Sequence, residues 1–221
     1  MKRRDFSKQL AGASLGLAWA GAAQAQAQVQ AQGAPVEGQH YVRLSTPVPV
    51  ALAADKKVEV VEFFWYGCPH CYAFEPMLDA WVKRLAPDVA FRQVPVGFMV
   101  PHQMHQKLFY ALEEMGQLPA LHNKIFAAIH QQNRRLSSES DIMAFVSANG
   151  VDGAKFSAAF KSFGVNTKAT RAKQLADAYK IDGVPALGVH GRFYTSGALA
   201  GSNERAMAVA DFLIQRARQS A

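Results

Sequence analysis

Cysteine is scarce in this chain: Cys68 and Cys71 are the only two among 221 residues. So few cysteines exclude a disulfide-stapled scaffold. A structural zinc site is disfavoured too, because there is no second cysteine pair and no His-x3-5-His pair. A disulfide between these two residues would close too short a loop to stabilise the fold much. The pair therefore favours a redox-active dithiol.

The chain also lacks the features of several other protein classes. Of its net charge of +7, residues 1–25 contribute +3, and the +4 of the rest is only mildly basic. No stripe of lysine and arginine is interleaved with aromatic residues, so we expect no nucleic-acid partner. Beyond the N-terminal region, no apolar stretch is long enough to span a bilayer. No internal repeat is visible. Half of the residues are apolar, which predicts a sizeable core.

The first 25 residues have the pattern of a cleavable export signal. A basic start precedes an apolar run over residues 10–23, and small residues offer cleavage sites after Ala25 or Ala27. Arg3 and Arg4 resemble a twin-arginine motif, although Ser7 stands where an apolar residue is usual, so that route and the Sec route both stay open. Residues 26–39 are rich in Gln, Ala, Gly and Pro and are expected to form a disordered linker.

The cysteines follow a nearly continuous apolar run over residues 58–65, which predicts a buried strand. Cys68 stands where the N-cap of the next helix is expected, with Pro69 in the first helical turn; we expect this helix over residues 71–86. A thiolate at a helix N-terminus lies at the positive end of the helix dipole, which lowers its pKa and makes it a nucleophile. Cys71, one turn further on, is expected to be the less exposed, resolving thiol.

The remaining patterns predict an α/β fold that contains a helical insertion. Further strands are expected at 40–44, 89–96, 186–190 and 193–195. The last two surround a short turn that contains Gly191, which predicts a β-hairpin. Helical patterns without an intervening strand run over 102–115, 120–132, 139–148 and 153–162. Ser138 or Ser140 can cap the third of these helices. Two more helices are expected, one capped by Asn166 and closed by Gly183, the other capped by Asn203 and ending at about residue 218. Four successive helices between strands predict an inserted all-helical domain.

Two segments resemble one known family. Glu62-Phe63-Phe64, followed by Cys68-Pro69-His70-Cys71-Tyr72 and Phe74-Glu75, is similar to the DsbA family of bacterial thiol:disulfide interchange proteins. The resemblance extends from about Tyr41 to the C-terminus and is strong again at Gly183-Val184-Pro185-Ala186. It implies a thioredoxin-like fold, with a thioredoxin-like domain at 40–98 and 164–221 and the inserted helical domain at 99–163.

The resemblance also implies an activity. It predicts a periplasmic thiol-disulfide oxidoreductase, a disulfide oxidase that donates its Cys68–Cys71 disulfide to newly exported, unfolded proteins with free thiols. That disulfide would be the only redox group, with no separate cofactor and no metal. A membrane-embedded, quinone-linked reoxidase of the DsbB type is the implied partner, and the protein is expected to be a monomer. The oxidising tendency is carried over from the family.

The family pattern assigns roles to five further residues. Pro69 and His70 form the dipeptide typical of the family, and His70 is expected to stabilise the Cys68 thiolate. The Val184–Pro185 peptide bond is expected to be cis and to lie beside the disulfide, with Val184 presenting backbone groups to a substrate chain. Glu62 is the expected buried acid beneath the active site, a proton relay to Cys71.

One position departs from the family pattern. The family's prototype pairs the buried acid with a lysine on the next strand, but Gln93 takes that place here and Arg92 points to the other face of the sheet. Glu62 is thus expected to lack a cationic partner. The histidines other than His70 are scattered along the chain, which predicts structural or surface positions for them.

Two alternative functions stay open at this point. A disulfide isomerase or reductase could use the same fold, although isomerases of this kind usually carry a dimerisation domain, for which residues 26–57 are too short. A non-catalytic, peptide-binding chaperone module is the other alternative, and it would tolerate the loss of Cys68.

Overall fold

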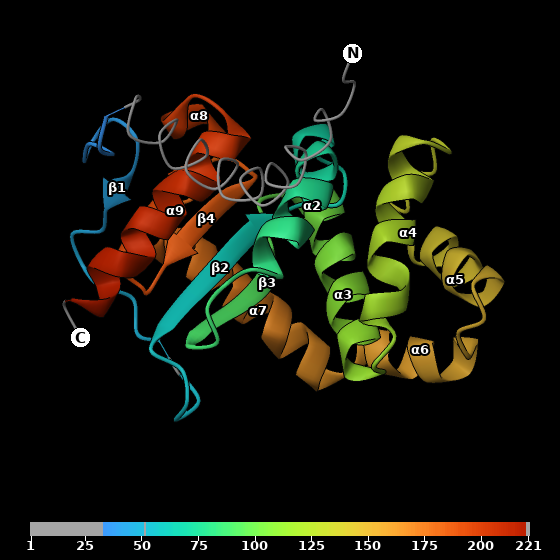
Figure 1. Cartoon of the computed structure of the whole chain (residues 1–221). Helices are drawn as coiled ribbons and strands as arrows, with labels where there is room; N and C mark the ends of the chain where they lie inside the picture. The colour runs from blue at the N-terminus through green and yellow to red at the C-terminus, as the bar shows by residue number, and fades with distance from the viewer. Residues whose placement is uncertain (1–32, 51, 220–221) are drawn as a thin grey trace, which may run out of the picture. The chain divides into compact units, whose positions relative to one another are not determined.

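A mixed sheet of five strands, in the order β1-β5-β4-β2-β3, carries the described part of the chain (Figure 1). The structure is a computed structural model that describes residues 33–50 and 52–219. The expected export signal lies outside these residues, as does most of the expected linker. The strands are β1 (Val42–Arg43), β2 (Val58–Phe64), β3 (Val89–Pro95), β4 (Ala186–Val189) and β5 (Phe193–Ser196).

Strand β2 lies inside the sheet and is buried along its whole length, as its apolar sequence predicts. It pairs in parallel with β3 and antiparallel with β4, and β4 and β5 form the predicted antiparallel hairpin. β1 adds to the edge of β5 and is shorter than the strand expected at 40–44. Because side chains alternate along a strand, β2 contributes to two cores, one on each face of the sheet.

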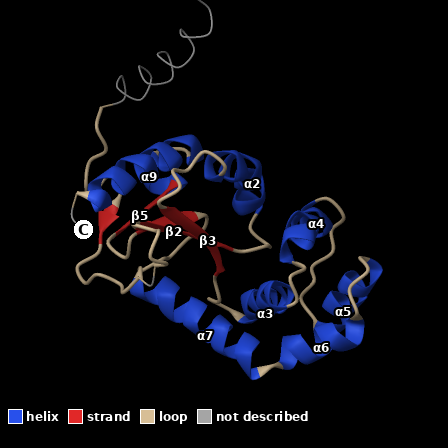
Figure 2. Ribbon diagram, turned by 60° about the horizontal axis from the view of Figure 1, so that its bottom comes forward, coloured by secondary structure: helices blue, strands red, loops and turns tan. Residues whose placement is uncertain are grey.

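Helices cover both faces of the sheet (Figure 2). Helices α2 (Pro69–Val82) and α9 (Asn203–Arg218) lie on one face, where Val58 and Val60 pack with Leu78 and Leu213. Helix α7 (Phe163–Ala178) lies on the other face, where Phe63 contacts Tyr179 just after that helix.

Four helices lie between β3 and α7, as predicted: α3 (Val100–Glu114), α4 (Leu118–His130), α5 (Glu139–Ala148) and α6 (Gly153–Lys161). Each begins and ends within two residues of its expected bounds. The predicted cap of α5 is confirmed, because the Ser138 side chain accepts a hydrogen bond from the backbone N–H of Asp141. The exact division into a thioredoxin-like and a helical domain stays a prediction.

The predicted end of α2 and the predicted start of α7 were wrong. Helix α2 ends at Val82 rather than near Ala86, because the chain continues in i→i−3 turns at Arg84 and Leu85. Helix α7 starts at Phe163, not at Asn166, because Ser162 accepts from the N–H of Val165 and so caps the helix earlier.

The end of α7 and the start of α9 also differ from the sequence expectation. Lys180, with φ of 56°, takes the left-handed position after α7 that was expected of Gly183. Ser202 rather than Asn203 caps α9, and a short helix α8 (Gly197–Ala200) precedes it.

The disordered linker predicted over residues 26–39 was drawn too long at its C-terminal end. Val36 begins a hydrogen-bonded turn in which its carbonyl accepts from the N–H of His40, while its own N–H donates to the His40 ring at 3.0 Å. These local hydrogen bonds order the chain before β1. Among the described residues, no helix is both long enough and apolar enough to cross a membrane.

Candidate active site

The two cysteines lie where β2 turns into α2. The turn is closed by the N–H of Cys68, which donates to the carbonyl of Trp65 at 3.0 Å. Gly67 is needed in this turn because a Cβ atom there would lie 2.3 Å from the Trp65 ring. Cys68 is the N-cap of α2 and Pro69 is its first residue, both as predicted. Proline is well suited to that position because the first helical N–H has no partner within the helix.

The electrostatic setting of Cys68 favours its thiolate. The pKa of Cys68 is lowered from 9.0 to about 6, chiefly because the Cys71 thiol donates a hydrogen bond to it. Burial opposes this shift, while the backbone N–H groups of Cys71 and His70 and the charge of His70 add to it. The Cys68 side chain accepts no capping hydrogen bond from the first turn of α2. The N–H groups there therefore stabilise the thiolate through the positive electrostatic potential at the helix N-terminus.

Cys71 differs from Cys68 in access and in acidity. It is fully buried, whereas Cys68 is 8 % exposed, so the order of exposure is as predicted although Cys68 is less open than a typical cap residue. Burial, together with the neighbouring Cys68 and Glu62, raises the pKa of Cys71. The site thus favours the thiolate form of Cys68 and the thiol form of Cys71. Both are free cysteines in this structure.

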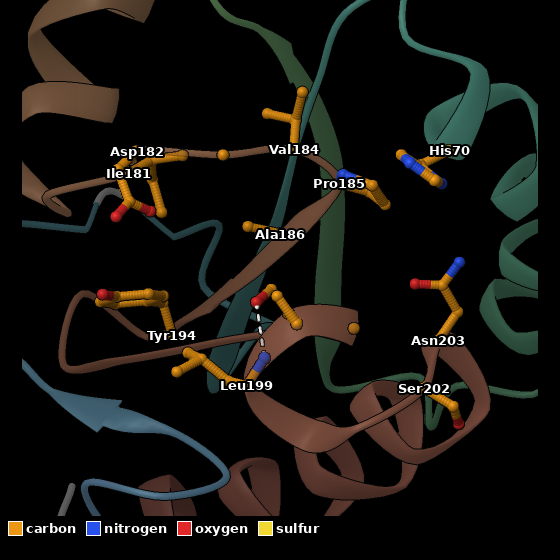
Figure 3. A pocket seen from close by; sticks show the side chains of 14 residues that line it. His70, Ile181, Asp182, Val184, Pro185, Ala186, Tyr194, Leu199, Ser202 and Asn203 are labelled. Atoms are coloured by element: carbon orange, nitrogen blue, oxygen red, sulfur yellow. Dashed lines mark hydrogen bonds between the residues drawn. The ribbon is translucent and has the colours of Figure 1, made fainter.

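The segment Gly183-Val184-Pro185-Ala186, which leads into β4, lies beside Cys68. The Val184–Pro185 peptide bond is cis, as predicted, and the Val184 carbonyl oxygen lies 3.4 Å from Cys68 Sγ. A groove of about 620 Å³ runs beside it. Figure 3 shows His70, Pro185 and Asn203 at one end of this groove and Tyr194 at the other.

Glu62 lies where the resemblance places it, fully buried on the α2 side of β2. Gln93 is its neighbour in the β2–β3 register and donates from Nε2 to Glu62 Oε2 at 2.8 Å. Arg92 points to the other face of the sheet, as expected, where its Nε donates to Glu59 Oε1. Burial, and next the negative charge of Glu75, raise the pKa of Glu62 well above its usual range.

The sequence reasoning missed three members of this buried cluster. Gln93 Nε2 also donates to Glu75 Oε1 at 3.1 Å, and His122 Nε2 lies 3.2 Å from the same oxygen. His122 Nδ1 lies 2.8 Å from the hydroxyl of Tyr66, whose pKa is raised by burial and by the nearby carboxyls. His122 was expected to be merely structural or at the surface, because nothing in its local sequence points to the site.

Helix α4 contacts the active-site segment a second time. His130, eight residues after His122 and so on a similar face of α4, donates from Nε2 to the Tyr66 carbonyl oxygen at 2.8 Å. Its ring stacks on that of Tyr72. Both the side chain and the backbone of Tyr66 are therefore held by histidines of α4.

The arrangement is suited to thiol-disulfide exchange. A nucleophilic thiolate, a buried second thiol, a buried acid and an adjacent groove meet at the end of an internal strand, a common place for sites in open α/β sheets. Within residues 33–50 and 52–219, no cluster of three or more His, Cys, Asp or Glu residues is arranged to hold a metal ion.

Comparison with known proteins supports this chemistry. The profile of the DSBA-like thioredoxin domain matches residues 59–208. The thiol:disulfide interchange protein DsbA of Azotobacter vinelandii is 44 % identical over 183 residues, covering 83 % of this chain and 85 % of that protein. The protein of the same name from Bordetella parapertussis is 41 % identical over 220 residues, covering 99 % of this chain and 100 % of the relative.

Solved structures agree with the fold. The crystal structure of Pseudomonas aeruginosa DsbA superposes with a TM-score of 0.79 at 40 % identity, covering 84 % of this chain and 96 % of that one. This confirms the predicted thioredoxin-like fold. From the family profile, the relatives and the dithiol geometry together, we conclude that the chain belongs to the DsbA family of thiol-disulfide oxidoreductases.

Proposed function

We propose that this enzyme is a disulfide donor that works in the periplasm on newly exported proteins with free thiols. The observation that carries the proposal is the lowered pKa of Cys68, about 6, beside a groove that can hold an extended chain. A thiolate of low pKa is a good leaving group, so a mixed disulfide at Cys68 is readily resolved in favour of the substrate. The oxidised enzyme therefore gives its disulfide away.

The reaction proceeds through two exchanges. A substrate thiolate attacks Cys68 Sγ, the Cys68–Cys71 bond breaks, and Cys71 leaves as a thiolate that takes the proton of the Glu62 carboxyl. The second substrate thiolate then attacks the substrate sulfur bound to Cys68. The substrate disulfide forms, Cys68 leaves as a thiolate, and the enzyme has gained two electrons.

Each remaining site residue supports one part of this sequence. Pro69 begins the helix whose N-terminus faces Cys68, and His70 adds its charge to that field. Val184 places its carbonyl oxygen near the reacting sulfur, and Pro185 lines the groove without offering a competing N–H. No cofactor besides the Cys68–Cys71 disulfide enters this sequence.

The reduced enzyme must pass its two electrons on. We assign this step to a membrane-embedded, quinone-linked reoxidase of the DsbB type, whose disulfide the Cys68 thiolate attacks before Cys71 closes the ring. The enzyme acts as a monomer in this scheme, since one chain supplies both thiols and the groove.

The equilibrium with glutathione tests the proposal. A donor should be mostly reduced in a buffer of glutathione that leaves ordinary structural disulfides intact, and it should oxidise a peptide with two free thiols in stoichiometric amounts. A mostly oxidised enzyme in that buffer would instead identify a reductase. Peptide binding that survives Cys68→Ser without any peptide oxidation by the wild type would identify a chaperone module.

A further inference from the structure

The proposed reaction leaves two negative charges close together in a buried cluster, on Glu62 and Glu75. Glu62 and Glu75 are joined through a single amide, that of Gln93. When Glu62 gives its proton to Cys71, two carboxylates face each other in a buried cluster, which disfavours the ionised state of both. In the part of the chain that the structure describes, no lysine or arginine pairs with either carboxyl.

The His122 ring is placed to supply a positive charge beside these carboxylates. Gln93 has two N–H donors, and Glu62 and Glu75 accept them, so the nearby Nε2 of His122 is left to donate to Glu75 at 3.2 Å. On the other side of the ring, the Tyr66 hydroxyl donates to Nδ1 when the ring is neutral. Because a hydroxyl can donate or accept, it can turn and accept from Nδ1–H once the ring is protonated.

We propose that His122 is a positioning residue for proton transfer at Cys71: it holds a proton beside Glu75 whenever Glu62 is ionised. The positive ring then offsets one of the two carboxylates. This proposal rests on the assigned role of Glu62 as the proton partner of Cys71. It gives a residue of the helical insertion a direct part in the charge balance of the redox site.

No other side chain that the structure describes in contact with the His122 ring can carry a positive charge. The titratable groups that contact it are Tyr66, in the turn after β2, and Glu75 on α2, and Glu62 is linked to it through Gln93. The remaining neighbours are neutral or aromatic: Gln93 on β3, Phe64 on β2, Phe109 on α3 and Phe126 on α4.

The cluster also has a path to solvent. Glu75 lines a second pocket of about 370 Å³, together with Asp79 and Asn123. The Glu75 side chain is 11 % exposed, so the carboxyl that His122 contacts has access to solvent through this pocket. A proton can thus enter from a pocket other than the one that holds His70 and Pro185, so proton uptake need not compete with a bound substrate.

A single-turnover reaction of the reduced enzyme with dithiobis(nitrobenzoate) isolates the step. The Cys68 thiolate attacks the reagent and releases one thionitrobenzoate. The Cys71 thiol then loses its proton to the Glu62 carboxylate and its sulfur attacks Cys68 Sγ. This breaks the mixed disulfide and releases a second coloured thiolate. The second phase is independent of reagent concentration, and its rate follows the ionisation of Glu62.

Replacing the ring by a neutral amide should move the pH profile of this second phase. The rate of the second phase rises with pH as Glu62 ionises, and the midpoint of that rise should lie about one pH unit higher in His122→Gln, because the variant lacks the positive ring. At a pH below the midpoint, the second phase of the variant should therefore be about tenfold slower than that of the wild type. The first phase should not change, since it needs only Cys68. The matched control is His105→Gln, which removes a buried histidine that bonds to the backbone at Leu136 and does not contact the carboxyls.

A structural role for His122 predicts a different result. Loss of packing would slow the second phase equally at every pH and leave the midpoint in place, and that outcome would overturn the proposal. Glu75→Gln offers an independent arm that leaves His122 intact: its midpoint should fall below that of the wild type. In the Glu75→Gln background, His122→Gln should move the midpoint no further, and an additive shift would refute coupling through Glu75.

These outcomes are separable from a failure of the proposed function. If wild-type enzyme does not oxidise peptide dithiols, the donor role is lost, but the second phase still reports whether His122 controls proton transfer at Cys71. If the donor role holds and the midpoint does not move, only the role of His122 is lost.

Discussion

Removing the Cys68 thiol should make the stability of the reduced enzyme less dependent on pH. The test compares reduced wild type with Cys68→Ser, which keeps a small neutral side chain at the N-cap. Because both proteins are compared without the disulfide, its effect on the unfolded chain does not enter. The difference in the free energy of unfolding then reports the ionisation of one thiol.

The size of the effect follows from the lowered pKa. A thiol with a pKa of about 6 in the folded state and 9.0 in the unfolded state stabilises the fold by at most about 4 kcal/mol above the unfolded pKa. At pH 7 the same linkage gives about 1.4 kcal/mol. Water reaches this sulfur in part and screens the interactions, so we expect about 1 kcal/mol, or about 2–4 °C in Tm.

The direction is set by the sign of the shift. Since the folded-state pKa is depressed, the stabilisation is present above the unfolded pKa and is lost as the pH falls through about 6. Urea unfolding in excess reductant, from about pH 5 to pH 8, measures the difference between the two proteins. A difference that stays constant over this range would show that the fold does not stabilise the thiolate.

Three further predictions concern neighbouring residues. Cys71→Ala should accumulate mixed disulfides through Cys68, visible as reductant-sensitive adducts, and accumulation by Cys68→Ser instead would reverse the two roles. Glu62→Gln should stabilise the fold increasingly as the pH rises above 4.5, because the buried carboxyl resists ionisation; equal denaturation midpoints at neutral pH would contradict this. Gly67→Ala should cost about 1–3 kcal/mol in thermal unfolding because the Trp65 ring must move, and an unchanged Tm would show that the ring yields freely.

Local sequence signals predicted the elements that carry the dithiol. The apolar run into β2, the proline after Cys68 and the turn between β4 and β5 each specify their structure over a few residues, and the structure confirms all three. Ser138 likewise announces α5 through a short-range cap. The start of α7 was missed because Ser162 caps it directly after α6, with no glycine or proline between the two helices.

The buried charge cluster could be predicted only in part. Family resemblance pointed to Glu62 and to the neutral Gln93, because these residues lie on strands paired in a known register. His122 comes from a helix far along the chain, and only the packing of α4 against α2 brings it to Glu75. Nothing in the sequence around His122 distinguishes it from His105, which bonds to the backbone instead.

The two hydrogen bonds from α4 to Tyr66 have a mechanical consequence. His122 holds the hydroxyl and His130 holds the carbonyl of a residue only two positions before Cys68. Any hinge motion that swings α4 away from the sheet must break one or both of these bonds and so loosen the turn that presents the attacking sulfur. The position of α4 and the geometry of the turn that carries Cys68 are therefore mechanically coupled.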